Sequence, residues 1–269
     1  MKNQRTSFLG VSFAVVFLAL CLWGCQEKPV SSDITSQPIE RHEGTAKDSV
    51  HISIEFPQSE NKQLCTAIVE YFNEELGGTY EGDYLDYEAF SSHYQTQYLN
   101  ELQHIRSGWD DMGDDMEINL SKDLTIRKSY ETDKLVTYEV STYDYTGGVH
   151  GYGVFYGITF RKSDGRHMGL NVLNPQHGDE VWNTYIKDGL MEYFNVTTDS
   201  ELSESMLGIE TYQIPAPQCE PYFSENGMEF VYQQYEISAY AYGRPSFTIS
   251  YDKLRPYLNI TGKRLLKEE

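Results

Sequence analysis

His150 and Asp144 are the two residues of this 269-residue chain whose types and spacing best suit acid–base chemistry. They lie on either side of Gly147-Gly148, in a segment that also contains Thr146. Glycine allows backbone conformations that other residues rarely adopt, so this loop can present the His150 imidazole as a base or a ligand. The alternative is a turn between strands in which the imidazole makes one structural hydrogen bond. The chain has neither a Gly-x-Ser-x-Gly nor a His-Glu-x-x-His motif, and this favours the structural alternative.

Other polar clusters carry weaker chemical signals. The acidic run from Asp110 to Glu117 offers oxygen ligands for calcium, but its spacing does not fit the twelve-residue calcium loop. A solvated acidic turn is therefore expected, with no metal site and no cofactor. Glu70, Glu74 and Glu75 are expected on the outer face of a helix.

A cysteine near the amino terminus suggests covalent attachment to lipid. Lys2 and Arg5 precede an apolar run from Phe8 to Trp23, and the run ends at Gly24-Cys25. This is the charge order and length of a secretory signal peptide, here residues 1–24, and the run is short for a membrane span. Its end resembles a lipobox, so Cys25 is predicted to be the lipid-attachment residue.

Charge and cysteine content agree with export. Cleavage before Cys25 leaves 19 basic and 41 acidic residues, a net charge of −22 with neutral histidines. Such a surface repels nucleic acid and anionic headgroups, so the membrane contact must run through the lipid. A cationic protein is the partner that electrostatics favours. Cys65 and Cys219 could form a disulfide in an oxidising envelope, or Cys65 could be a buried free thiol.

The elements that position these residues follow from apolar periodicity. Residues 25–48 are polar and rich in Ser, Pro and charge, which predicts a flexible tether. Beyond the tether, alternating and helical patterns predict an α+β fold with helices packed on an antiparallel sheet. The expected strands are 52–56, 116–126, 136–142, 154–160 and 247–251, and the expected helices are 64–76, 90–109 and 182–194.

Two further features are predicted for the sheet. Asn226-Gly227 indicates a hairpin with a type I′ turn. Because the strands of residues 116–160 alternate, one face of their sheet is expected to be polar, open and lined by tyrosines.

The string from Tyr143 to Gly151 resembles a tyrosine-rich segment of the DUF4163 and DUF3298 families, in which Ala usually stands at the position of Val149. The order of strand, Pro57 and helix matches the DUF4163 module. The order of Tyr235-Glu236-Ile237, Ala241-Tyr242-Gly243 and the strand from Phe247 matches the end of the DUF3298 module. The resemblance covers about residues 50–258, and it marks Thr146, Gly147, Gly148 and His150 as the family loop. It implies two consecutive modules, a DUF4163-like module at 49–160 and a DUF3298-like module at 161–262.

These families include the ectodomain of an anti-sigma factor that senses lysozyme and an accessory module of a polysaccharide deacetylase. Neither use assigns catalysis to the module. Together with the predicted lipid on Cys25, the resemblance implies a lipid-anchored protein of the cell envelope, periplasmic or surface-facing, whose ectodomain binds a cell-wall polymer or a secreted, lysozyme-like protein. Two alternatives stay open. One is a hydrolase of envelope glycan centred on His150 and Asp144, and the other is a structural lipoprotein.

Overall fold

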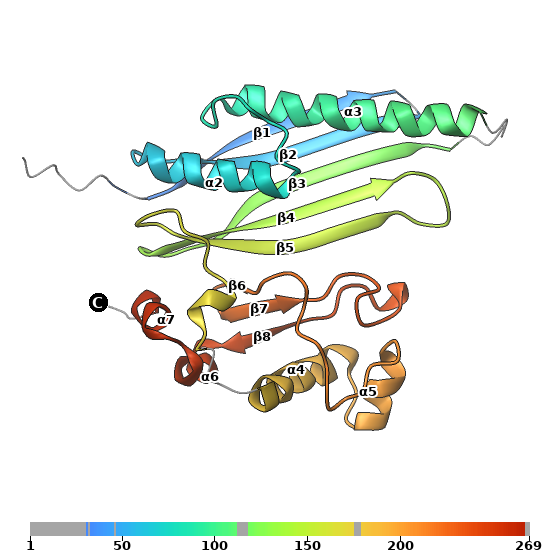
Figure 1. Ribbon diagram of the computed structural model, residues 1–269. Helices are drawn as coiled ribbons and strands as arrows, with labels where there is room; N and C mark the ends of the chain where they lie inside the picture. Colours follow the sequence, from blue (N-terminus) through green and yellow to red (C-terminus); the bar gives the residue numbers. More distant parts are fainter. Residues whose placement is uncertain (1–30, 32, 46, 112–117, 175–178, 267–269) are drawn as a thin grey trace, which may run out of the picture. The chain divides into compact units, whose positions relative to one another are not determined.

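The first sheet has five strands in the order β1-β2-β3-β4-β5 (Figure 1). The computed structural model describes residues 31, 33–45, 47–111, 118–174 and 179–266. The elements of this first module are β1 (Thr35–Gly44), β2 (Asp48–Gln58), α2 (Lys62–Glu75), α3 (Tyr87–Asp111), β3 (Leu120–Glu131), β4 (Leu135–Tyr145) and β5 (Tyr152–Arg161). The predicted signal peptide, Cys25 and most of the acidic run after Asp111 lie outside the described residues.

Strand pairing in this sheet is antiparallel except between β2 and β3, which are parallel. A parallel pair requires a long crossover connection, and α2 and α3 provide it. Both helices lie on the same face of the sheet (Figure 1). The predicted α+β fold is confirmed, with a mixed rather than a purely antiparallel sheet.

The first core lies between that face and the two helices. In β2, alternate residues from Val50 to Phe56 are almost completely buried, as the period of two requires. The aromatic stripe of α3 forms part of this core, because Phe90, Tyr94, Tyr98 and Leu102 are buried against the sheet. Helix α2 begins at the N-cap Asn61, whose Oδ1 accepts the backbone N–H of Leu64 at 3.1 Å.

Strand β1 contradicts part of the predicted flexible tether. Residues from Thr35 to Gly44 pair with β2 over their whole length. Ile34 and Ile39 are buried in the first core. The strand stays polar because it is the edge of the sheet, where one side of its backbone is unpaired and Pro38 is tolerated. The ordered fold therefore begins before Thr35, and the predicted first module boundary at residue 49 is too late.

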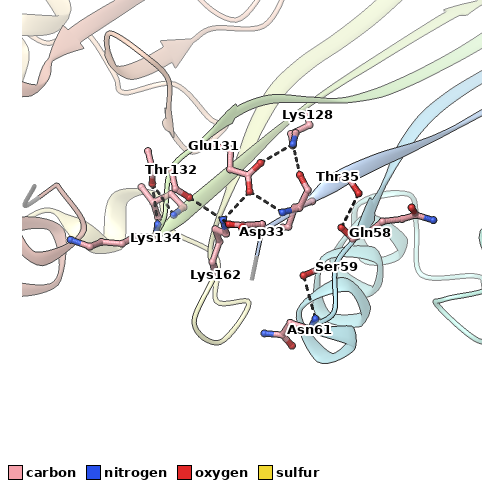
Figure 2. Close-up of polar contacts among 12 residues, drawn as sticks. Asp33, Thr35, Gln58, Ser59, Asn61, Lys128, Glu131, Thr132, Lys134 and Lys162 are labelled. Carbon is pink, nitrogen blue, oxygen red and sulfur yellow. Dashed lines mark hydrogen bonds and ion pairs between the residues drawn. The ribbon is translucent and has the colours of Figure 1, made fainter. Parts of the chain in front are cut away.

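A polar cluster fixes the start of β1 to the rest of the sheet (Figure 2). The Glu131 carboxylate accepts the backbone N–H of Ile34 at 3.0 Å and the ammonium groups of Lys128 and Lys162 at 2.7 and 2.8 Å. Lys128 also donates to the Ile34 carbonyl at 2.5 Å, and Lys162 donates to the Thr132 carbonyl at 3.1 Å. The Lys162 side chain is only 3% exposed, so its charge depends on these partners.

The second module has a sheet of three antiparallel strands in the order β6-β7-β8. Its elements are η1 (Leu170–Val172), α4 (Asp179–Phe194), α5 (Asp199–Ser205), β6 (Tyr222–Phe223), β7 (Gly227–Val231), η2 (Tyr240–Tyr242), β8 (Ser246–Ser250), α6 (Tyr251–Leu254), η3 (Arg255–Tyr257) and α7 (Ile260–Leu265). A separate core joins this sheet to α4, with Ile186, Leu190, Phe230 and Phe247 among its members. Each module thus has a hydrophobic core of its own.

The predicted hairpin joins β6 and β7, but its turn is not of type I′. Phe223 pairs with Met228, and the Ser224 N–H donates to the Gly227 carbonyl at 2.8 Å, so Glu225 and Asn226 occupy the turn. Neither has a positive φ, which a type I′ turn demands of both central residues. Gly227 serves the sheet instead, because a Cβ there would lie 2.2 Å from the Ile249 carbonyl oxygen in β8. Burial of Met228 sets this register.

The second module packs on the face of β4 and β5 that was expected to be open and polar. The buried Thr137 and Thr159 hydroxyls contact each other at 2.8 Å. Thr137 Oγ1 donates to the Phe223 carbonyl at 2.8 Å, and the Phe223 N–H donates to Thr159 Oγ1 at 2.9 Å. The tyrosine ring of Tyr222 lies against the bare backbone of Gly157, where a Cβ would be 2.1 Å from the ring. The expectation of a broad, open tyrosine face is therefore wrong for this part of the sheet.

Cys65 is buried and Cys219 is half-buried, and both are free thiols. Of the two possibilities that the sequence left open, the structure has the unbridged one. None of the helices within the described ranges combines the length and apolar composition of a membrane span.

Candidate functional site

The family loop connects β4 to β5 and contains the two predicted glycines. Gly147 and Gly148 have φ values of 98° and 107°, as the prediction of unusual backbone conformation required. The Trp109 ring of α3 lies against Gly147, where a Cβ would be 2.7 Å from the ring. Trp109 Nε1 donates to the Thr146 carbonyl at 3.2 Å. The loop is therefore fixed by α3 rather than free.

The His150 side chain contacts residues of the second module. Its ring stacks on Tyr240 at a centroid distance of 3.9 Å and an angle of 18°. Nδ1 lies 2.9 Å from the Gly151 carbonyl oxygen, and Nε2 lies 3.1 Å from the Tyr235 hydroxyl. A carbonyl oxygen only accepts, so Nδ1 donates to Gly151, and Nε2 shares a hydrogen bond with the Tyr235 hydroxyl. Both ring nitrogens therefore have hydrogen-bond partners.

Asp144 has a different environment. Its carboxylate pairs with Lys122 at 3.2 Å, and Lys122 also donates to Glu101 at 2.5 Å. Burial alone would lower the pKa of Lys122, but Glu101 and Asp144 outweigh it and raise that pKa. The Lys122 ammonium also lies 4.9 Å from the centroid of the Tyr98 ring. Asp144 therefore has a structural partner in the sheet.

The structure does not bring the predicted pair together. Across the part of the chain that is described, no hydrogen bond or ion pair joins His150 to Asp144. A general base needs a carboxylate or another group that orients it toward a substrate, and His150 has a tyrosine and a backbone carbonyl instead. Asp144 lies in β4 and His150 lies in the loop that follows it, and their proximity in the sequence does not place them in one site.

The loop instead contributes to an exposed aromatic surface, here called the His150 surface and made of Tyr143, Val149, His150, Tyr235 and Tyr240. Val149 is 99% exposed, Tyr235 is 49% exposed and Tyr143 is 40% exposed. Tyr143 covers Gly151, where a Cβ would lie 2.4 Å from the ring, and the rings of Tyr235 and Tyr240 are 5.6 Å apart. Tyr235 holds a positive φ of 67°, an uncommon conformation for an aromatic residue. These contacts hold exposed aromatic side chains in fixed positions, which is typical of recognition surfaces.

A second site was not predicted from the sequence. A cleft of about 680 Å³ is lined by residues of both modules, including Tyr71, Glu75, Tyr156, His167 and Glu220. Glu75 was expected on the outer face of α2, and it lines this cleft. Only the helical spacing of Tyr71 and Glu75 was visible in the sequence, because the other residues meet through the tertiary fold.

The fold and these sites define an α+β protein of two modules, and solved structures share this fold. A crystal structure of a DUF3298 family member from Bacteroides fragilis NCTC 9343 is similar, with a TM-score of 0.67 and 20% identity over 88% of this chain and 97% of that one. A DUF3298 family protein from Pseudomonas aeruginosa PAO1 gives 0.59 and 16% identity, over 90% of this chain and 98% of that one. No curated protein matches.

The match to a sequence family covers less of the chain than the structural matches do. Residues 173–252 match the family described as a protein of unknown function, DUF3298. The chain therefore contains a DUF3298 domain in its second module, as predicted. That domain includes Tyr235 and Tyr240 of the His150 surface.

Proposed function

We propose that this protein is a lipid-anchored component of the cell envelope whose ectodomain binds a macromolecule through the His150 surface. The observation that carries the proposal is the stacking of His150 on Tyr240 with both imidazole nitrogens satisfied, beside exposed Val149 and Tyr235. Exposed aromatic residues held in place lose little conformational entropy on binding, and tyrosine is enriched at the energetic centres of interfaces.

The anchor in this proposal is the predicted lipid on Cys25. In the sequence, residues 26–33 lie between Cys25 and Ile34, which directly precedes β1. The Glu131 cluster ties Ile34 to β3 and to Lys162 (Figure 2).

Two ligand classes fit the proposal. The mature charge of −22 favours a cationic secreted protein such as a lysozyme, because complementary charge raises the association rate. A cell-wall polymer is the other, since aromatic rings can cover the apolar faces of sugar rings. The hydrolase hypothesis has lost its proposed centre, because His150 and Asp144 have separate partners.

The proposal is tested by capture from envelope extract with soluble chain 26–269, which retains every described element. The matched variants are Tyr240→Ala within the His150 surface and Tyr212→Ala, which removes a tyrosine that is 74% exposed elsewhere. A ligand retained by wild type and Tyr212→Ala and lost by Tyr240→Ala supports the proposal. Equal retention by both variants, with circular dichroism showing that both are folded, would contradict it.

A further inference from the structure

The 680 Å³ cleft has the composition of a binding site for a positively charged group. Its walls come from the end of α2, from strands β4 and β5, from His167 after β5 and from the segment before β6. It shares no lining residue with the His150 surface. Its volume is within the range of small-ligand pockets.

Two carboxylates, those of Glu75 and Glu220, line this cleft. Burial and the neighbouring Glu75 carboxylate raise the pKa of both Tyr71 and Tyr156. Glu220 Oε2 accepts the Leu170 N–H at 3.2 Å. It can do so because Gly169 has no Cβ, which would lie 2.1 Å from that oxygen.

The carboxylates have no permanent cation beside them in the cleft. Among the residues known to line it, none is a lysine or an arginine. The one ionisable base is His167, whose Nδ1 lies 3.9 Å from Glu220 Oε2. Burial lowers the pKa of His167, so its imidazole is neutral at pH 7. The cleft therefore presents two negative charges among aromatic rings.

A similar combination of groups holds an ammonium beside Tyr98, whose ring also lines the cleft. Lys122 Nζ lies over the Tyr98 ring, with Glu101 at 2.5 Å and Asp144 at 3.2 Å. A tyrosine ring and two carboxylates are thus sufficient, in this fold, to enclose a primary ammonium group.

We propose that the cleft binds a primary ammonium group between Glu75 and Glu220, against the rings of Tyr71 and Tyr156. The group can come from a free polyamine or from a lysine side chain of a protein. This site is independent of the His150 surface, so each proposal can fail without the other.

The test is titration calorimetry at low and moderate salt with three probes: spermidine, an N-terminally acetylated tri-lysine peptide amide, and the same peptide acetylated also on each side-chain amine. The protein is soluble chain 26–269 as wild type, Glu75→Gln, Glu220→Gln and Glu70→Gln. The last variant changes net charge equally on the exposed outer face of α2 and controls for general attraction of polycations.

Wild type and Glu70→Gln should bind the charged probes with affinities within about twofold of each other, and not the acetylated peptide. Loss of a hydrogen-bonded charge should weaken binding by about tenfold or more in Glu75→Gln and in Glu220→Gln. Preference for spermidine would identify a free amine, and preference for tri-lysine would identify a protein side chain. Failure of both charged probes to bind, or equal affinity in all variants, would overturn the proposal. Because Glu220 lies on an exposed segment, its variant tests the idea even if Glu75→Gln disturbs α2.

Discussion

The substitution Glu131→Gln should destabilise the protein and loosen β1 in particular. The carboxylate accepts the Ile34 N–H and two ammonium groups (Figure 2). The amide keeps the shape but removes the charge, which leaves Lys162 at 3% exposure with a backbone carbonyl of Thr132 and the exposed carboxylate of Asp33. A buried ammonium without a close counter-charge is costly.

The size of the effect follows from this geometry. Breaking a buried ion pair by removing one partner costs about 3–5 kcal/mol. The Glu131 side chain is 23% exposed and Lys162 keeps two partners. The expected loss of unfolding free energy is therefore smaller than that full cost, about 2–3 kcal/mol. For a domain of this size that corresponds to a drop in Tm of roughly 4–12 °C.

The effect should depend on pH in a defined direction. Burial alone would raise the pKa of Glu131, but hydrogen bonds from Lys128 and Lys162 outweigh it and hold that pKa below its ordinary value of 4.5. As pH falls, the Glu131 carboxylate therefore becomes protonated at a higher pH in the unfolded chain than in the folded one. Its contribution to the free energy of unfolding is fully present above pH 4.5. It is lost as pH falls through the folded-state pKa, so the wild-type advantage should shrink in acid.

Urea unfolding followed by circular dichroism, from neutral pH to the acid limit of the folded state, measures both quantities. Glu70→Gln makes the same chemical change at an exposed position and should cost less than about 0.5 kcal/mol. Compared with wild type, hydrogen exchange in Glu131→Gln should be accelerated more in β1 than in β4. The reasoning is refuted if Glu131→Gln is as stable as Glu70→Gln, or if its deficit does not change as pH falls.

Three further outcomes are expected. Cys25→Ser should abolish incorporation of labelled palmitate and partition into detergent; retained label would contradict lipid attachment. Gly148→Val should lower unfolding free energy by about 1–3 kcal/mol in the same urea assay, because valine is strained at a φ of 107°; an unchanged midpoint would contradict this. A soluble fragment starting at residue 49 should melt well below one starting at residue 26, because it lacks β1 and buried Ile39; equal melting temperatures would show that β1 is dispensable.

The helices and strands with a clear apolar period could be predicted from the sequence. Helix α2 was readable from its apolar spacing and from Gly77-Gly78, both of which have positive φ where the helix ends. Strand β1 was missed because an edge strand is ordered by backbone pairing, and its ten residues contain only one buried apolar side chain, Ile39. Polar composition is a poor guide to disorder where a neighbouring strand offers a complete ladder of hydrogen bonds.

The candidate sites were predictable only where they are local. The Gly147-Gly148 loop and its exposed His150 could be read from the residues themselves. The stacking of His150 on Tyr240 could not, because it depends on how the second module packs against β4 and β5. The same holds for the ammonium cleft, where Glu75 and Glu220 come from different modules. Tertiary contacts between distant segments carry no signal in local periodicity.

The central claim is that the ectodomain binds a macromolecule through the His150 surface. Its most direct test is titration calorimetry of soluble chain 26–269 against a lysozyme and against purified cell-wall polymer, at low salt and at about 0.1 M salt. We predict binding of at least one ligand, weakened about tenfold or more by Tyr240→Ala and unchanged by Tyr212→Ala. Binding of lysozyme should also weaken as salt shortens the screening length to about 10 Å. Absence of heat with both ligands from folded protein, or equal binding by the two tyrosine variants, would contradict the claim.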